Sequence, residues 1–113
     1  MVNAMVLLDT NGPLPVKATF NSPVEGSVMF VLTATAWTET DNTLVMVTLA
    51  LDDAEIGNSS MCFSNGSYSH MALRPTFIPY DSLTIGEHTI YVDAGNSNAI
   101  GDLNDYFQVT MFY

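Results

Sequence analysis

The sequence has very few basic residues. Lys17 and Arg74 stand against 12 acidic residues, which gives a formal net charge of −10 at pH 7. A protein that binds nucleic acid needs clustered lysine and arginine to displace counterions from phosphates. Two basic residues cannot form such a cluster, so the composition excludes nucleic-acid binding. It also disfavours anionic membrane surfaces as partners.

Cysteine is almost absent as well. Cys62 is the single cysteine, which excludes an intramolecular disulfide and any zinc site built from several cysteines. Its neighbours in the chain are Met61 and Phe63, so we expect Cys62 to be a small buried apolar residue. Stability must then come from the packing of the core or from association with other chains.

Long apolar runs are the third absence. No stretch approaches the roughly 20 residues that a membrane-spanning helix needs. The run at 4–8 is too short for a secretory signal and has no basic residue before it. We therefore expect no membrane insertion, no signal peptide and no transmembrane segment in the chain as given.

Short β-strands are what the sequence does contain. Threonine and valine are abundant, turn residues recur at short intervals, and no segment keeps a helical period. The 113 residues are enough for one domain, 1–113. We predict an all-β domain with two antiparallel sheets packed as a sandwich, seven to nine strands and no significant helix. An immunoglobulin-like strand order is the main prediction, and a jelly roll is the alternative.

Two hairpins are predicted within this sandwich. Residues 27–38 and 44–51 are both apolar on two faces, and we expect them to pair through the turn at 39–42. Residues 59–64 and 67–73 flank Asn65-Gly66, a dipeptide that favours a two-residue hairpin turn. Pro75 and Pro79 indicate an edge strand or an irregular crossover between them.

Three stretches resemble bacterial immunoglobulin-like domains. LALDDAEIG at 49–57 is similar to a turn of that family, although Asp53 stands where the family has glycine. LTIGEHTIYV at 83–92 and DYFQVT at 105–110 are similar to its late strands. The resemblance implies a non-catalytic module, as found in adhesins, surface modules and virion decorations, and it implies no site residues.

A sugar-binding surface is one candidate function for such a sandwich. Sugars bind through an exposed aromatic ring together with hydrogen-bonding Asp or Asn side chains. The candidate ligand-binding residues are Trp37, Glu39, Asp41 and Asn42, and the other aromatic candidates are Tyr68, Tyr80 and Tyr106. The alternative for Trp37 is burial in the core.

Metal sites have only weak candidates. Asp102, Asn104 and Asp105 are calcium candidates, because calcium takes six to eight oxygen ligands and they lie in a loop rich in Asp and Asn. The alternative is a turn in which these side chains bond their own backbone. A zinc site formed by Cys62, His70 and His88 is a weaker alternative, because the three residues lack the close spacing typical of zinc ligands. We therefore expect no cofactor. We expect a hydrogen-bonding role for His88 beside a turn, and we expect His70 to be a half-exposed sheet residue.

Catalytic signatures are missing. No Gly-x-Ser-x-Gly motif occurs, and a sandwich this small has little room for a deep cleft. The main prediction is a non-catalytic structural or interaction protein, such as a virion decoration, capsid-associated or surface-appendage module. It would act through a protein partner or as a homo-oligomer, in a virion or a cell-surface assembly. A lectin-like carbohydrate-binding module is the alternative.

Overall fold

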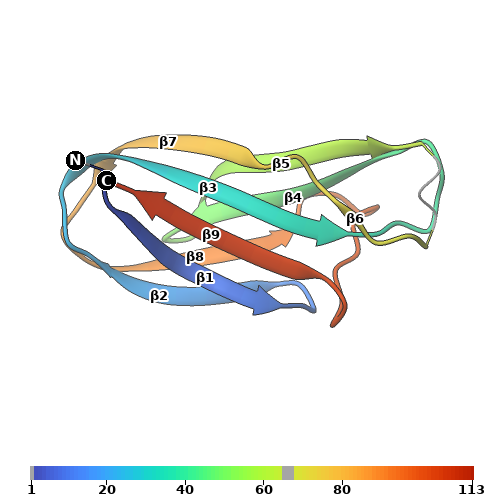
Figure 1. Cartoon of the computed structure of the whole chain (residues 1–113), viewed down its shortest axis with the longest axis horizontal. Helices are drawn as coiled ribbons and strands as arrows, with labels where there is room; N and C mark the ends of the chain where they lie inside the picture. Colours follow the sequence, from blue (N-terminus) through green and yellow to red (C-terminus); the bar gives the residue numbers. More distant parts are fainter. Residues whose placement is uncertain (1, 65–67) are drawn as a thin grey trace.

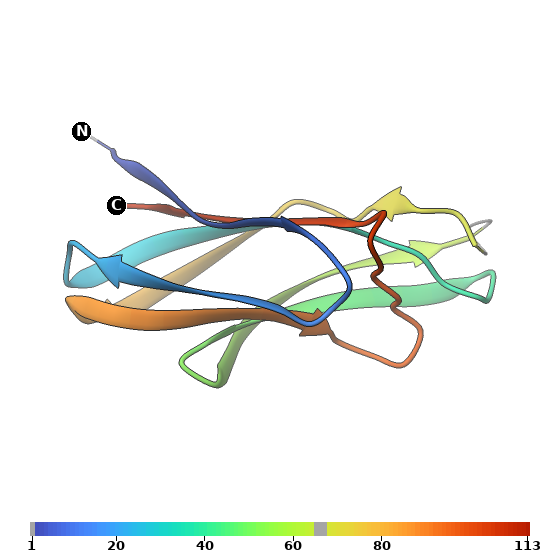
Figure 2. The ribbon, with the colours of Figure 1, turned by 90° about the horizontal axis from the view of Figure 1, so that it is seen from below.

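The computed structural model describes residues 2–64 and 68–113, and it places them in two packed β-sheets (Figures 1 and 2). The strands are β1 Ala4–Asn11, β2 Val16–Ser22, β3 Gly26–Ala36, β4 Thr43–Leu51, β5 Ala54–Phe63, β6 Met71–Ala72, β7 Thr76–Leu83, β8 Gly86–Ala94 and β9 Tyr106–Phe112. The predicted class is confirmed: the domain is an all-β sandwich of two antiparallel sheets, with no helix among the described residues.

The two sheets differ in width. The five-stranded sheet has the order β1-β9-β3-β6, and β7 also pairs with β3. The four-stranded sheet has the order β2-β8-β4-β5. Seen edge-on, the sheets form two separate layers (Figure 2). β3 is therefore the central strand of one layer, and its far end is where the candidate site described below is built.

Alternation along the strands supplies the core. In β3 every second residue from Val28 to Ala36 is buried, and β4 buries every second residue from Val45 to Leu51. Such a two-residue period places one face of each strand against the opposite sheet. Phe107, Val109 and Met111 of β9 complete the apolar layer and are fully buried.

The predicted pairing of 27–38 with 44–51 is wrong. β3 pairs with β6, β7 and β9, while β4 pairs with β5 and β8 in the other sheet. The segment at 37–42 therefore crosses from one sheet to the other. Both strands have a fully buried face, and these two faces can cover each other only when the strands lie in opposite layers. The alternating apolar residues of β3 and β4 identified both as strands. They did not show that the two strands lie in opposite sheets and face each other across the core.

The tight hairpin is formed by β4 and β5, the next pair of strands along the chain. β4 and β5 pair over their whole length through Asp52 and Asp53, which have φ values of 50° and 69°. Positive φ at both central residues is what a two-residue hairpin turn requires, and aspartate tolerates this conformation better than most residues. The predicted turn at Asn65-Gly66 lies outside the described residues. The strand expected after it is reduced to β6, which pairs with β3 and not with β5.

Cys62 is exposed, contrary to the prediction. It lies on the edge strand β5 opposite Leu44, and the side chain of Leu44 is also exposed. Both residues belong to the outer face of the four-stranded sheet. Their apolar neighbours in sequence point the other way, into the core. β7 is an edge strand in the described sheet, as its prolines predicted, and Pro79 is exposed.

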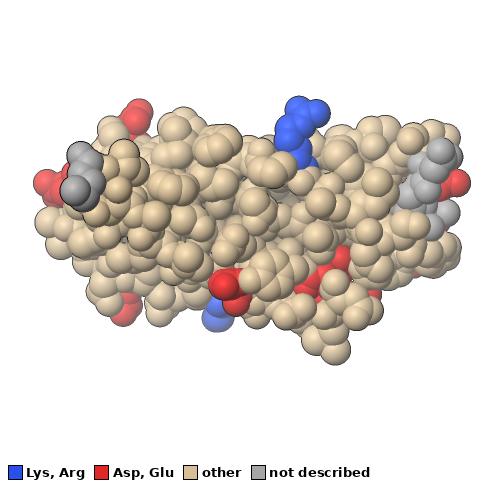
Figure 3. Space-filling view, in the orientation of Figure 1, with Lys and Arg blue, Asp and Glu red and all other residues tan. Residues whose placement is uncertain are grey.

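The outer face of the five-stranded sheet carries few charges. In the space-filling view, acidic and basic side chains interrupt this face at only a few places (Figure 3). Val6, Phe77 and Phe112 expose 56%, 66% and 36% of their surface. Val31 is the cross-strand neighbour of Phe77, so apolar side chains continue across the sheet. Within 2–64 and 68–113, no helix is long and apolar enough to span a membrane.

Candidate functional site

The end of β3 is joined to the long loop that precedes β9. Trp37 follows β3 directly and forms an isolated bridge with Ile100, in which each backbone N–H donates to the other residue's carbonyl over 2.9 Å. This bridge holds the segment 100–105 against the end of the five-stranded sheet. The short strand β6 lies on the other side of β3. Three distant segments of the chain thus meet around Trp37.

Aromatic rings gather at this junction. The ring centroids of Trp37 and Tyr68 are 5.5 Å apart with an interplanar angle of 32°, and the centroid of His70 lies 5.9 Å from that of Trp37. The Trp37 indole Nε1 donates a hydrogen bond to Asp102 Oδ2 over 3.1 Å. Trp37 is half-buried and its one polar atom is bonded, so its ring orientation is fixed.

Tyr68 is the exposed member of this cluster. Its side chain is 67% exposed, and its backbone has a φ of 61°. A bulky residue in the left-handed region is strained by about 1–2 kcal/mol. The Tyr68 N–H donates to the carbonyl of Thr38 over 2.7 Å, which anchors the residue to the chain just beyond β3. A strained backbone that presents an exposed ring is a feature that favours a binding role.

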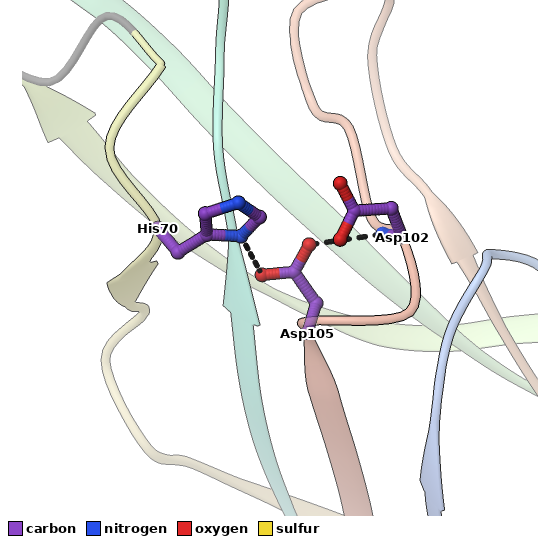
Figure 4. Close-up of side chains that lie close together, drawn as sticks. All are labelled: His70, Asp102 and Asp105. Carbon is purple, nitrogen blue, oxygen red and sulfur yellow. Dashed lines mark hydrogen bonds and ion pairs between the residues drawn. The ribbon is translucent and has the colours of Figure 1, made fainter.

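A buried carboxylate lies beside the rings. Asp105 is fully buried, and its Oδ1 accepts hydrogen bonds from Thr35 Oγ1 over 3.1 Å and from His70 Nδ1 over 2.8 Å. Its Oδ2 accepts from the backbone N–H of Asp102 over 2.9 Å. Figure 4 shows Asp102 and Asp105 on the loop that leads into β9, with His70 approaching them from the side of β6. The carboxylate group of Asp105 is therefore held in one orientation.

His70 is the hydrogen-bond and ion-pair partner of Asp105. The hydrogen bond from His70 to Asp105 raises the pKa of the imidazole above its usual value, against the opposing effect of burial, and the charges of Asp105 and Asp102 add to the rise. The His70 side chain is 35% exposed. The site thus places a partly exposed imidazole over a buried carboxyl group.

The connection between β1 and β2 supports the acidic part of the site from behind. The backbone N–H of Gly12 donates to the carbonyl of Asp105 over 3.0 Å, and that of Leu14 donates to the carbonyl of Gly101 over 3.2 Å. A Cβ atom at Gly12 would lie 2.3 Å from the carbonyl oxygen of Asp102. Glycine is therefore required at position 12, because any side chain there would displace the Asp102 backbone.

The other histidine belongs to a different structure. The Nδ1 of His88 contacts Asp52 Oδ2 at 2.5 Å, and its Nε2 lies 2.7 Å from the carbonyl oxygen of Thr84. The hydrogen bond to Asp52 raises the pKa of His88, although burial opposes the rise. Burial alone would raise the pKa of Asp52, but the hydrogen bonds from His88 and from the Thr89 N–H hold it below the usual value.

The predicted hydrogen-bonding role of His88 is therefore confirmed. His70, which was expected to be a half-exposed sheet residue, lies just before β6, is partly exposed and bonds to Asp105. The zinc site of Cys62, His70 and His88 is not assembled. Each histidine has its own carboxylate partner, in separate parts of the sandwich.

The predicted sugar-binding residues are only partly brought together. Glu39 lines a small hollow of about 60 Å³, whose other lining residues are Thr38, Thr40, Ser97, Asn98 and Ile100. Asp41 and Asn42 are exposed in the turn before β4. The partners that the structure gives to the Trp37 side chain are Tyr68, His70 and Asp102. The sequence analysis did not predict this grouping, because it paired β3 with β4. It therefore did not predict that β6 pairs with β3 and places His70 near Trp37.

The calcium candidates lie in one tight turn. The Asn104 N–H donates to Asp102 Oδ1 over 2.8 Å, and the Asp102 N–H donates to Asp105 Oδ2. Asp102 and Asp105 are thus adjacent, whereas Asn104 contributes its backbone to this network. Side chains that bond their own local backbone were the stated alternative to calcium binding.

A second concave surface lies on the opposite sheet. A hollow of about 510 Å³ is lined by Thr48, Ala50, Asp53, Glu55, Tyr91, Asp93 and Ala94 of β4, β5 and β8 and the turn between β4 and β5. It combines three acidic residues with a single half-buried tyrosine. It has no stacked pair of rings like that of Trp37 and Tyr68 among the described residues.

Solved structures with a similar fold are mostly carbohydrate-binding modules. A family 35 module of Clostridium thermocellum is 13% identical, with 98% of this chain and 89% of that chain covered and a TM-score of 0.55. The CBM35 of Cellvibrio japonicus Abf62 is 12% identical, with 96% and 92% covered and a TM-score of 0.53. Latent PorU of Porphyromonas gingivalis is 12% identical with a TM-score of 0.60; 97% of this chain is covered but only 12% of that chain.

No protein-family model matches the chain, and no curated protein sequence matches it. The structural similarities show the fold: a β-sandwich like that of these modules, and not specifically an immunoglobulin-like one. They overturn the prediction of a virion decoration, capsid-associated or surface-appendage protein, since the similar folds belong mostly to carbohydrate-binding modules.

Proposed function

We propose that this chain is a non-catalytic carbohydrate-binding module that binds a neutral glycan at the end of β3. The observation that carries the proposal is the exposed ring of Tyr68, which lies against the tilted ring of Trp37, whose indole is hydrogen-bonded to Asp102. Sugar rings have apolar faces that stack on aromatic rings, while their hydroxyl groups need hydrogen-bond partners. The sandwich fold shared with carbohydrate-binding modules supports the same function.

Polar groups suitable for hydroxyl recognition lie at the Trp37 indole and in the hollow that the residues after Trp37 help to line. Asp102 is half-exposed next to Trp37, and Glu39 lines the hollow with Ser97 and Asn98. Carboxylates accept hydrogen bonds from hydroxyl groups through up to four lone-pair sites. The net charge of −10 repels uronate-rich polymers and leaves neutral polysaccharides as the favoured class.

Affinity electrophoresis and Trp37 fluorescence test this proposal. The probes are soluble xylan, galactan, β-glucan and mannan, with polygalacturonate as an anionic comparison. We expect at least one neutral polymer to retard the protein and to change the emission of Trp37, which is the single tryptophan. Tyr68→Ala should weaken that binding by about tenfold or more, since stacking on one ring contributes about 1.5 kcal/mol.

Tyr91→Ala is the matched control. It removes one tyrosine from the acidic hollow of the other sheet and leaves the Trp37 cluster intact. Equal binding by wild type and Tyr91→Ala, with loss in Tyr68→Ala, supports the site at the end of β3. Loss in Tyr91→Ala alone moves the sugar site to the four-stranded sheet and contradicts the location proposed here. No retardation by any polymer contradicts the function itself.

A further inference from the structure

We propose that His70, Asp102 and Asp105 form a binding site for one divalent transition-metal ion of the zinc class. The potential ligand atoms of these three side chains all lie within 4.8 Å of one another. They come from two segments: His70 from the approach to β6, and Asp102 and Asp105 from the loop before β9 (Figure 4). This inference does not require that a glycan binds, although Asp102 belongs to both proposed sites.

The distances are close to those of a metal site. Zinc binds imidazole nitrogen and carboxylate oxygen at about 2.0–2.2 Å, so the ligand atoms of a tetrahedral site lie about 3.3 Å apart. The Nδ1 of His70 and the Oδ1 of Asp105 are 2.8 Å apart. A separation larger by about half an ångström would admit the ion between them. His70 is exposed, so its side chain can make this movement without disturbing the core.

The carboxylates are already oriented by groups outside the ligand set. Thr35 Oγ1 donates to Asp105, and Trp37 Nε1 donates to Asp102. Hydrogen bonds of this kind orient metal ligands in known sites. Asp105 Oδ1 accepts from both Thr35 and His70, so it has a lone pair for an ion once His70 Nδ1 binds the ion instead. In known sites, removal of a residue that hydrogen-bonds a metal ligand typically lowers metal affinity 10–100-fold. The bonds from Thr35 and Trp37 should therefore strengthen metal binding by Asp105 and Asp102.

The charge balance also favours a cation. Two carboxylates, one of them fully buried, face a single imidazole, and the ion-pair partner that the structure gives to Asp105 is His70. A buried anion is costly unless it is well compensated. A divalent ion supplies two positive charges at the point where these side chains meet. Nitrogen in the ligand set favours zinc, cobalt or nickel over calcium and magnesium, which prefer oxygen ligands.

The partly exposed position leaves room for water to complete the coordination. The His70 side chain is 35% exposed, and Asp102 is half-buried. Three protein ligands with an open fourth position are typical of zinc sites that keep a bound water.

Titration calorimetry with Zn²⁺ on chelator-treated protein tests the proposal directly. Cys62→Ser serves as the background, since the exposed thiol of Cys62 is itself a zinc ligand. We expect one Zn²⁺ per chain. His70→Gln and Asp102→Asn should each weaken binding at least tenfold, and the asparagine still offers an acceptor to the Trp37 indole. Asp53→Asn is the matched control, because it removes a charge from the other acidic hollow.

Trp37 gives a second readout. Co²⁺ bound at this site would quench the emission of Trp37, whose indole is bonded to Asp102, and His70→Gln should abolish the quenching at the same Co²⁺ concentration. The thermal unfolding midpoint of each variant without metal shows whether it is folded. Unchanged affinity in both His70→Gln and Asp102→Asn, a loss confined to Asp53→Asn, or tighter binding of Ca²⁺ than of Zn²⁺ would overturn the proposal.

Discussion

Two His–Asp pairs lie toward opposite ends of the sandwich, and they are built in opposite ways. His88 is buried and its partner Asp52 is 49% exposed, while Asp105 is fully buried and its partner His70 is 35% exposed. In the first pair the imidazole is enclosed and both ring nitrogens meet oxygen acceptors. In the second pair the carboxylate is enclosed and the ring faces solvent.

The difference separates a pair that the fold encloses from a pair that borders the proposed binding site. His88 joins the β4–β5 turn to the start of β8, and its ring also lies 5.6 Å from that of Phe20. Its interactions are complete within the fold. The carboxylate of Asp105, by contrast, organises a set of exposed groups around Trp37. The same two residue types thus serve stability at one end and a surface site at the other.

Removing the buried carboxylate should have the largest effect. We expect Asp105→Ala to lower the free energy of unfolding by about 3 kcal/mol, because Thr35, His70 and the Asp102 N–H lose their acceptor in a buried setting. Asp52→Ala should cost about 1 kcal/mol, since its carboxylate is half-exposed. Urea unfolding of the two variants measures both values. Equal losses would mean that the two pairs do not differ as described.

Removing the histidine of each pair, in place of the aspartate, should reverse the ranking of the two pairs by loss of stability. His88→Ala removes a buried ring with two hydrogen-bonded nitrogens, and we expect a loss of about 2 kcal/mol. His70→Ala should cost less than about 1 kcal/mol, because Asp105 keeps its bonds from Thr35 and from Asp102. Denaturant midpoints of the two alanine variants give the comparison. A larger loss at His70 than at His88 would contradict it.

The His88–Asp52 pair should also make stability depend on pH, with an effect on the free energy of unfolding that is smaller than the losses predicted above. The raised pKa of His88 contributes stability that is complete below the ordinary imidazole pKa of about 6.5 and is lost as the pH rises through the folded value. The lowered pKa of Asp52 contributes stability that is complete above its ordinary value of 3.8 and is lost on acidification. The pair therefore stabilises most between these limits, by less than about 1 kcal/mol, since Asp52 is open to solvent.

Asp52→Asn isolates this effect, because the amide oxygen can still accept a hydrogen bond from neutral His88. Urea midpoints at pH 5.5 and pH 9 should differ more in the wild type than in this variant. The background from the net charge of −10 is nearly common to both proteins. An identical pH difference in the two would show that His88 gains no charged partner in the fold.

Local features of the fold were predictable from the sequence, and its pairings were not. The two-residue alternation of β3, β4 and β9 identified strands and their buried faces. Alternation says which face is apolar but not which strand lies beside it, so the partner of β3 was misassigned. The positions of Asp102 and Asp105 in a polar loop were visible, whereas the contact of Asp105 with His70, 35 residues away in sequence, depends on that pairing.

The aromatic part of the site was only half visible. Trp37 was a candidate because it ends a strand beside acidic residues, and Tyr68 was one among several exposed tyrosine candidates. Their stacking depends on the bond from the Tyr68 N–H to the Thr38 carbonyl and on the left-handed backbone of Tyr68. Neither feature leaves a signal in the local sequence, since tyrosine is uncommon at positive φ.

The sparsely charged outer face of the five-stranded sheet also governs how the molecule rests on solid supports. On polystyrene or another apolar plastic, the exposed Val6, Phe77 and Phe112 would turn this face toward the support. The rings at the end of β3 lie along the same layer and would be masked. Immobilisation through the thiol of Cys62, on the outer face of the other sheet, would leave the outer face of the five-stranded sheet free of the support.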